Sequence, residues 1–158
     1  MEIGVILAIS GAALAIIFGG IGSSLGVGMV GKAGAGLVAE DAKYFGQSLL
    51  LQALPGSQAI YGFLAAILIL QGIGLIGGNV KDVSFYQGLA LLFASLPVSL
   101  TCLISAIFQG KVAASALSIV AKDPARGGQG IILASLVETF AILGLLISIL
   151  MITGIKIA

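Results

Sequence analysis

The chain has 158 residues, of which 59% are hydrophobic and 8% charged, and it contains 24 glycines. A soluble domain carries about a quarter charged residues, so seven basic and six acidic side chains are too few to cover a water-facing surface. This near balance leaves no basic patch for nucleic acid, and the hydrophobicity excludes disorder. A single cysteine, Cys102, and no histidine exclude a disulfide scaffold, a zinc site and Ser-His-Asp or Cys-His catalysis. The composition predicts a small polytopic membrane protein.

Four long apolar stretches follow one another along the chain. Three carry no charge and the fourth carries only Glu138; they are residues 3–31, 44–80, 83–110 and 127–155. A bilayer core of about 30 Å needs about 20 apolar residues as helix, and continuous apolar runs favour helices over a barrel. We therefore predict an all-α membrane protein with four transmembrane helices, near residues 3–38, 44–77, 84–121 and 128–156. The third helix would be about 57 Å long at 1.5 Å per residue, so it must extend beyond the lipid.

The basic residues predict an orientation in the membrane. Five of them surround the first-to-second and third-to-fourth connections: Lys32, Lys43, Lys111, Lys122 and Arg126. Lys81 and Lys156 lie on the other side. The positive-inside rule places the two basic connections in the cytoplasm and both termini outside. The N-terminal run lacks a basic flank and exceeds the length of a signal peptide, so we read it as the first span.

The two halves of the sequence repeat at a displacement of 82 residues. Apolar composition alone does not explain the polar and glycine pairs that this displacement aligns: Gly28 with Gly110, Asp41 with Asp123, and Gln47 with Gln129. The repeat divides the chain into two hairpins that run in the same direction, residues 1–79 and 80–158. Glu138 of the second hairpin aligns with Gly56 of the first, so the four predicted helices contain one carboxylate within the membrane.

Small residues recur over almost every face of the first helix, where Gly22 and Gly26 form one of several close pairs. In lipid, helix association depends on close packing, which small residues permit. A first helix that is packed closely on more than one side is typical of the inner wall of a tight ring. Ordinary packing within a four-helix monomer is the alternative.

Glu138 is the only charge deep within a span. An ionised carboxylate at mid-membrane costs about 2.5–3.5 kcal/mol on insertion scales, so a proton, a cation or a partner charge must neutralise it. A protonated glutamic acid that only makes a stabilising interhelical hydrogen bond is the alternative. Four residues of the second span share one helix face by their spacing, and they are Leu54 and the polar residues Ser57, Gln58 and Tyr61.

Further oxygen atoms complete a candidate cation site. Pro55 has no N–H, which frees a backbone carbonyl of the helix, and Gly56 clears volume beside it. Gln109 on the third span supplies another amide, and Thr139 adjoins Glu138. One carboxylate, two carboxamides, a hydroxyl and a carbonyl suit a monovalent hard cation. Packing hydrogen bonds are the alternative role for each glutamine.

Three strings in this order, together with the glycine-rich first helix, resemble the membrane-rotor proteolipids of V-type rotary ATPases. They are Leu54-Pro55-Gly56-Ser57-Gln58 with Tyr61, Gln109-Gly110-Lys111-Val112-Ala113, and Val137-Glu138-Thr139-Phe140-Ala141-Ile142-Leu143. The likeness covers essentially the whole chain and is greatest to the sodium-transporting bacterial members. It implies a closed rotor ring of copies of this chain, surrounded by lipid in a prokaryotic plasma membrane. The implied partners are a stator subunit with an arginine and a central-stalk subunit at the cytoplasmic face.

The resemblance also implies the site and its role. The chain would carry Na+ as the transported ion at one carboxylate site, as a translocase subunit without a catalytic site or a cofactor of its own. The implied sodium ligands are the Leu54 backbone carbonyl, Ser57, Gln58, Gln109 and Glu138, with Tyr61 holding the carboxylate. The family often has threonine where this chain has Ser57, and the hydroxyl is retained.

Three alternatives to the sodium rotor stay open from the sequence. The first is the same rotor with H+ as the coupling ion, which the paired glutamines disfavour. The second is a small transporter that exchanges protons for drugs; the absence of tryptophan and the glycine-rich first helix argue against its aromatic cavity. The third is a purely structural protein with four spans.

Overall fold

In the computed structural model, which describes residues 2–157, every regular element is a helix. Short 3-10 turns join or interrupt the longer helices. In chain order the elements are α1 (Ile3–Glu40), η1 (Ala42–Tyr44), α2 (Phe45–Ala53), η2 (Leu54–Gly56), α3 (Ser57–Gly72), α4 (Phe85–Lys122), η3 (Pro124–Arg126) and α5 (Gly127–Gly154). Within the described residues, four helical segments are long and apolar enough to cross a membrane. The predicted all-α fold with four spans is confirmed.

The predicted helix bounds hold to within two residues, except where the second span ends. The prediction continues that span to residue 77, but α3 ends at Gly72. Gly74, Gly77 and Gly78 follow with φ angles of 74°, 119° and 79°. These are left-handed conformations, which glycine adopts without steric strain and which end a right-handed helix.

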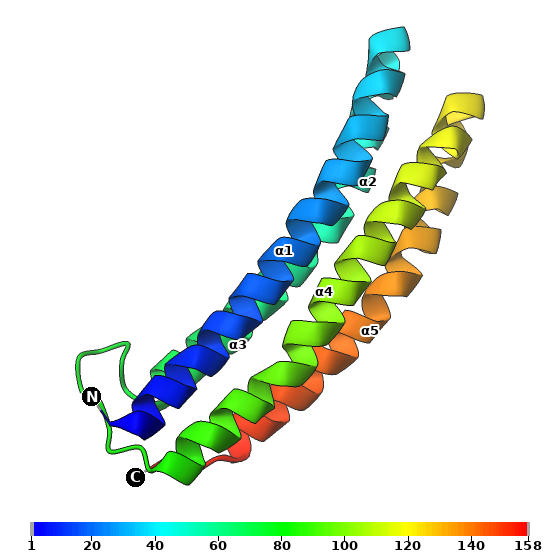
Figure 1. Ribbon diagram of the computed structural model, residues 1–158. Coiled ribbons are helices and arrows are strands. Elements are labelled where there is room, and N and C mark those ends of the chain that lie inside the picture. Colours follow the sequence, from blue (N-terminus) through cyan, green and yellow to red (C-terminus); the bar gives the residue numbers. More distant parts are fainter. Residues whose placement is uncertain (1, 158) are drawn as a thin grey trace.

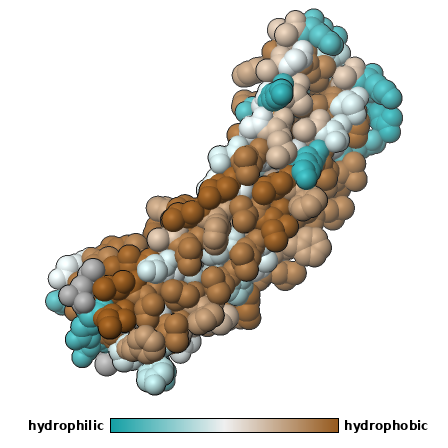
Figure 2. Space-filling view, in the orientation of Figure 1, coloured by the Kyte–Doolittle hydropathy of each residue, from teal (hydrophilic) through white to brown (hydrophobic). Residues whose placement is uncertain are grey.

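The four spans form a long, curved bundle with both termini at one end (Figure 1). α1 and α4 lie side by side, α3 packs on α1, and α5 packs on α4. Figure 2 shows a continuous hydrophobic middle between hydrophilic ends. The end opposite the termini holds η1 and η3. Two hydrogen bonds link the hairpins there, from Tyr44 Oη in η1 to the Ala121 carbonyl of α4 (3.3 Å) and from Gln47 Nε2 in α2 to the Pro124 carbonyl of η3 (2.6 Å).

Equivalent capping bonds start the two turns at this end. Asp41 accepts from the Lys43 amide at 3.0 Å, and Asp123 accepts from the Ala125 amide at 3.0 Å. The hydrogen bond from the Lys43 side chain, 2.7 Å from Asp41, lowers the pKa of that carboxyl below its ordinary value. The cap is therefore fully formed above the ordinary range of an aspartate and is lost as the pH falls through the lowered pKa.

Glycines bring the backbones of α1 and α4 into contact. A Cβ atom added at Gly11 would lie 2.8 Å from the Leu92 Cα, and one at Gly22 would lie 2.8 Å from the Leu103 Cα and carbonyl oxygen. At other positions on α1, including Gly36, a Cβ would meet nothing within 4 Å. The close packing expected from the small residues is present within the chain, and part of the glycine surface is left open.

Replacing Gly22 with alanine is expected to destabilise the protein by about 1–3 kcal/mol, the usual penalty of overpacking, because the obstructing atoms are backbone and cannot move aside. Gly36→Ala is the matched control, and it should be neutral or stabilising by up to about 1 kcal/mol because alanine favours helix. Thermal unfolding of the purified protein in detergent measures both. Equal unfolding temperatures for the two variants would contradict the backbone contact.

Candidate functional site

The site begins where Pro55 interrupts the second span. η2 replaces one turn of α-helix between α2 and α3, as the missing N–H of the proline predicts. The Ser57 hydroxyl donates to the Leu54 carbonyl at 3.0 Å across this turn. The Ala59 amide donates to Ser23 Oγ of α1 at 2.9 Å, which ties the interrupted segment to the neighbouring helix. The turn is thereby fixed from two sides and presents polar atoms at membrane depth.

Three donors from the other spans surround the carboxylate of Glu138 on α5. Its Oε1 accepts from Ser57 Oγ and from Tyr61 Oη, each at 2.5 Å. Its Oε2 accepts from Gln109 Nε2 at 3.2 Å. Glu138 is half-buried, and within residues 2–157 it forms no ion pair. The charge must therefore be balanced by a proton, a bound cation or a group from another chain.

The two predicted glutamines form a buried pair behind the carboxylate. Gln58 Nε2 donates to Gln109 Oε1 at 2.5 Å, and both side chains have no exposed surface. Gln58 Nε2 also lies 3.3 Å from Ser105 Oγ. A buried amide is costly unless its polar atoms are paired, so each glutamine fixes the orientation of the other. This pairing places the Gln109 nitrogen, rather than its oxygen, against Glu138.

Oxygen atoms outnumber protons around Ser57. Its Oγ lies within 3.3 Å of three acceptors, which are the Leu54 carbonyl, Gln58 Oε1 and Glu138 Oε1. A hydroxyl has one proton, so it can satisfy one of the three at a time. Tyr61 supplies a second proton to Glu138 Oε1, so the Ser57 proton is the one available to the Leu54 carbonyl and Gln58 Oε1. Oxygens that converge with so few protons form an environment that attracts a further proton or a hard cation.

The structure adds Ser105 to the site, which sequence reasoning treated only as a small packing residue. Its hydroxyl donates to the Val137 carbonyl at 2.9 Å and so links α4 to α5 beside Glu138. The available signal was its position four residues before Gln109, on the same helix face. Thr139 does not join the site, since it is exposed and its hydroxyl donates to the Leu136 carbonyl of its own helix at 2.7 Å.

Fold and site together define a class of protein: a membrane-spanning bundle of two repeated helical hairpins that hold a single carboxylate among hydroxyls and carboxamides. The sequence profile of the family of ATP synthase C subunits matches residues 10–69 and 92–151. The chain belongs to this family, as a duplicated rotor proteolipid of the V- and A-type ATPases. The two matches are displaced by 82 residues, which confirms the predicted repeat.

Two curated relatives share nearly the whole sequence. The V-type sodium ATPase subunit K of Enterococcus hirae is 49% identical over 149 residues, which cover 94% of this chain and 92% of the relative. The A-type ATP synthase subunit K of Methanocaldococcus jannaschii is 44% identical over 150 residues, which cover 95% of this chain and 63% of that longer protein. The predicted resemblance to V-type rotor proteolipids is confirmed.

Proposed function

We propose that this proteolipid carries Na+ across the membrane, one ion per chain, in a closed ring that turns as the soluble sector hydrolyses ATP. The observation that supports this proposal is the convergence of the Leu54 carbonyl, Gln58 Oε1 and Glu138 Oε1 on Ser57 Oγ, whose one proton can satisfy only one of these three oxygens at a time. A cation in their midst replaces the missing donors and balances the carboxylate charge. The sodium-transporting relative supports Na+ as that cation.

Two neighbours complete the proposed site. Tyr61 holds the carboxylate in place through its 2.5 Å hydrogen bond to Glu138. Gln109 Nε2 donates to Glu138 Oε2, so the Gln109 amide oxygen would reach the ion only after a half rotation of the carboxamide, which breaks its bond from Gln58 Nε2. The proposed ligands of Na+ are therefore the Leu54 carbonyl, Ser57, Gln58, Gln109 and Glu138.

The proposed mechanism follows from the solvation of the carboxylate. With Na+ bound, Glu138 is neutral overall and can face lipid while the ring turns. Release needs a competing positive charge, which we assign to the arginine of a stator subunit. The ATP chemistry belongs to the soluble sector, linked through a central-stalk subunit at the cytoplasmic face. In this scheme the chain is a translocase subunit that binds no nucleotide itself.

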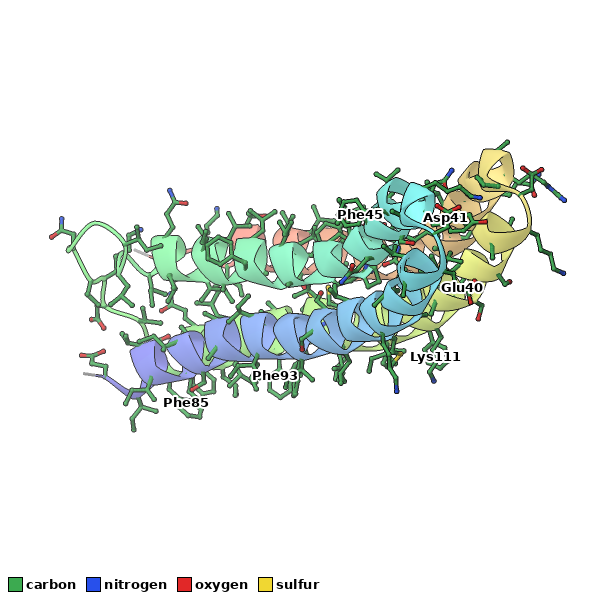
Figure 3. All side chains as sticks on the ribbon, turned by 90° about the horizontal axis from the view of Figure 1, so that it is seen from above. Glu40, Asp41, Phe45, Phe85, Phe93 and Lys111 are labelled. Carbon is green, nitrogen blue, oxygen red and sulfur yellow. The ribbon has the colours of Figure 1, made fainter. Side chains whose placement is uncertain are left out.

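We propose a prokaryotic plasma membrane as the location, with both termini outside and the η1 and η3 turns in the cytoplasm. Most of the basic residues support this orientation, because five of the seven lie in η1 or η3 or in the halves of α1 and α4 that lead to these turns, and Figure 3 shows Lys111 toward that end. In this proposal the two repeated hairpins contribute different parts of the site. Residues 1–79 supply the oxygens of η2 and α3, and residues 80–158 supply the carboxylate.

A proton is the second candidate for the transported ion. Ser57, Tyr61 and Gln109 already surround the carboxylate with hydrogen-bonding groups, and a protonated Glu138 fits among them. Sodium binding requires the ionised carboxylate, so with Na+ the apparent affinity falls on acidification, whereas proton binding is favoured by it.

The test uses the assembled ATPase in sealed vesicles. We expect Na+ to stimulate ATP hydrolysis, and ATP to drive uptake of radioactive sodium that persists when a protonophore is added. A rate of ATP hydrolysis that does not depend on Na+, together with sodium uptake that the protonophore abolishes, would contradict the sodium proposal. This result would favour the proton as the transported ion.

Ser57 offers a graded test of the hydroxyl in the site. Ser57→Ala is expected to raise the Na+ concentration for half-maximal ATP hydrolysis by about 10-fold or more, because a hydrogen-bonding group beside a charge contributes about 1.5–3 kcal/mol. Ser57→Thr keeps the oxygen and restricts its rotamers, so its Na+ requirement should equal or fall below that of the unmodified chain. The same Na+ requirement in Ser57→Ala and Ser57→Thr would show that the Ser57 hydroxyl is not a ligand of the ion.

A further inference from the structure

Ser105 of α4 lies between the buried glutamine pair and the helix that carries Glu138. Its side chain is only 4% exposed. The hydroxyl donates to the Val137 carbonyl of α5 at 2.9 Å and accepts from Gln58 Nε2 at 3.3 Å. The two bonds are compatible, because a hydroxyl oxygen can accept while its one proton is donated elsewhere. Ser105 therefore connects the backbone next to Glu138 to the side-chain amide of Gln58.

The proton of Ser105 decides which end of the Gln58 carboxamide faces it. Because that proton is donated to the Val137 carbonyl, only lone pairs of the hydroxyl are directed at Gln58. A lone pair accepts from an N–H and repels a carbonyl oxygen, so Gln58 turns its nitrogen toward Ser105. The other end of the carboxamide, Oε1, then lies 3.3 Å from Ser57 Oγ, on the side of the proposed ion.

Ser105 is also one of two acceptors for the nitrogen of Gln58. This nitrogen has two hydrogens, of which Gln109 Oε1 accepts one at 2.5 Å and Ser105 Oγ accepts the other at 3.3 Å. Gln109 Oε1 can join the ion only by leaving Gln58 Nε2, and Ser105 is then the acceptor that remains. Since a buried amide is costly without a partner, Ser105 keeps Gln58 in place while Gln109 rotates.

We propose that Ser105 is a positioning residue of the ion site, which holds the Gln58 carboxamide with its oxygen toward the ion. The inference rests on the proposed sodium transport and adds a residue that does not contact the ion itself. Ser105 acts through Gln58, so replacing Ser105 should have no effect on sodium binding in a chain that lacks the amide of Gln58.

A purely structural serine at this position would behave differently. A hydroxyl that only joins α4 to α5 acts through the Val137 carbonyl, so its loss would weaken the packing of the hairpin. Assembly of the complex, or the rate of ATP hydrolysis at every Na+ concentration, would then fall. Loss of a positioning hydroxyl instead raises the Na+ concentration that is needed and leaves the maximal rate unchanged. The apparent Na+ affinity and the maximal rate therefore separate the two roles.

The test measures the Na+ dependence of ATP hydrolysis by the assembled ATPase that carries Ser105→Ala. We expect the Na+ concentration for half-maximal hydrolysis to rise by about 3- to 10-fold, the factor that corresponds to one hydrogen bond, at an unchanged maximal rate. Ser99→Ala is the matched control. Ser99 is also a buried serine of α4, but its hydroxyl donates to the Ser95 carbonyl of the same helix at 2.7 Å. Its replacement should leave the Na+ requirement unchanged.

A double variant tests whether the effect passes through Gln58. Gln58→Leu is expected to raise the Na+ requirement by itself, and adding Ser105→Ala should cause no further rise, because the amide that Ser105 positions is gone. A further rise by the same factor would overturn the positioning role. So would a lower maximal rate at an unchanged Na+ requirement, or loss of the ring on native gel electrophoresis in Ser105→Ala but not in Ser99→Ala.

The unmodified complex distinguishes failure of this inference from failure of the proposed function. ATP hydrolysis that does not depend on Na+ in the unmodified complex would contradict sodium transport itself. Na+-dependent hydrolysis with the same Na+ requirement in the unmodified and Ser105→Ala complexes would refute the positioning role alone.

Discussion

Replacing Glu138 with glutamine is expected to abolish ATP-driven sodium uptake, with a loss of at least about 100-fold, since removing one charge of a buried pair costs about 3–5 kcal/mol. The amide keeps the size of the side chain and one accepting oxygen, but it can neither balance a cation nor release a proton. The buried pair Gln58 and Gln109 would then face a site without charge. Uptake of radioactive sodium by vesicles containing the assembled ATPase measures the effect.

Glu40→Gln is the control for this variant, because Glu40 is exposed, is the last residue of α1 and lies next to Asp41 at that end of the bundle (Figure 3). It loses the same charge in the same chain and should transport at the unmodified rate. Glu138→Asp keeps the charge but withdraws it from Ser57 and Tyr61, so partial transport with weaker Na+ dependence is expected. Full transport by Glu138→Gln would show that the carboxylate is structural.

Replacing Gln58 with leucine is expected to raise the Na+ concentration needed for half-maximal ATP hydrolysis by about 10- to 100-fold. The change removes one proposed ligand oxygen. It also leaves Gln109 Oε1 without the Gln58 Nε2 donor that it has in the unmodified protein. An unsatisfied buried polar group costs about 1–3 kcal/mol, in addition to the lost ligand. Because the two amides bond each other, Gln58→Leu and Gln109→Leu together should cost less than the sum of their separate effects.

The control is Gln71→Leu, at an exposed position near the end of α3 and outside the site. Its Na+ dependence should match that of the unmodified protein. An unchanged Na+ requirement in Gln58→Leu, at full expression and assembly, would contradict a role for the glutamine pair in ion binding.

Much of the fold was predictable because lipid imposes simple requirements. Long uncharged runs must be helical spans, and helical spacing placed Ser57 and Tyr61 on one face, where both contact Glu138. The early end of α3 at Gly72 was not predicted, since residues 73–77 are as apolar as the span itself. Only the left-handed backbone at Gly74 shows that the helix has stopped.

The site was less predictable where it depends on packing between distant helices. Serine is common on close-packed membrane helices, so nothing in the sequence separates Ser23 from the other small residues, and the one signal for Ser105 is its position four residues before Gln109. Their roles arise because α1 approaches the interrupted turn at Ala59, and because Gln58 is buried beside Ser105. The orientation of the Gln109 amide follows from its bond to Gln58, which spacing along one helix cannot indicate.

Sodium protection of Glu138 from a hydrophobic carbodiimide tests the central claim most directly. The reagent modifies a protonated carboxyl in the membrane, and Na+ bound at the proposed ligands Leu54, Ser57, Gln58 and Gln109 would exclude both the proton and the reagent. The assembled complex is treated at moderately acidic pH with and without NaCl, with KCl as the ionic control, and the modified peptide is quantified by mass spectrometry. We predict that Na+, but not K+, suppresses labelling of Glu138 in a saturable manner, whereas equal labelling in both salts would contradict a sodium site.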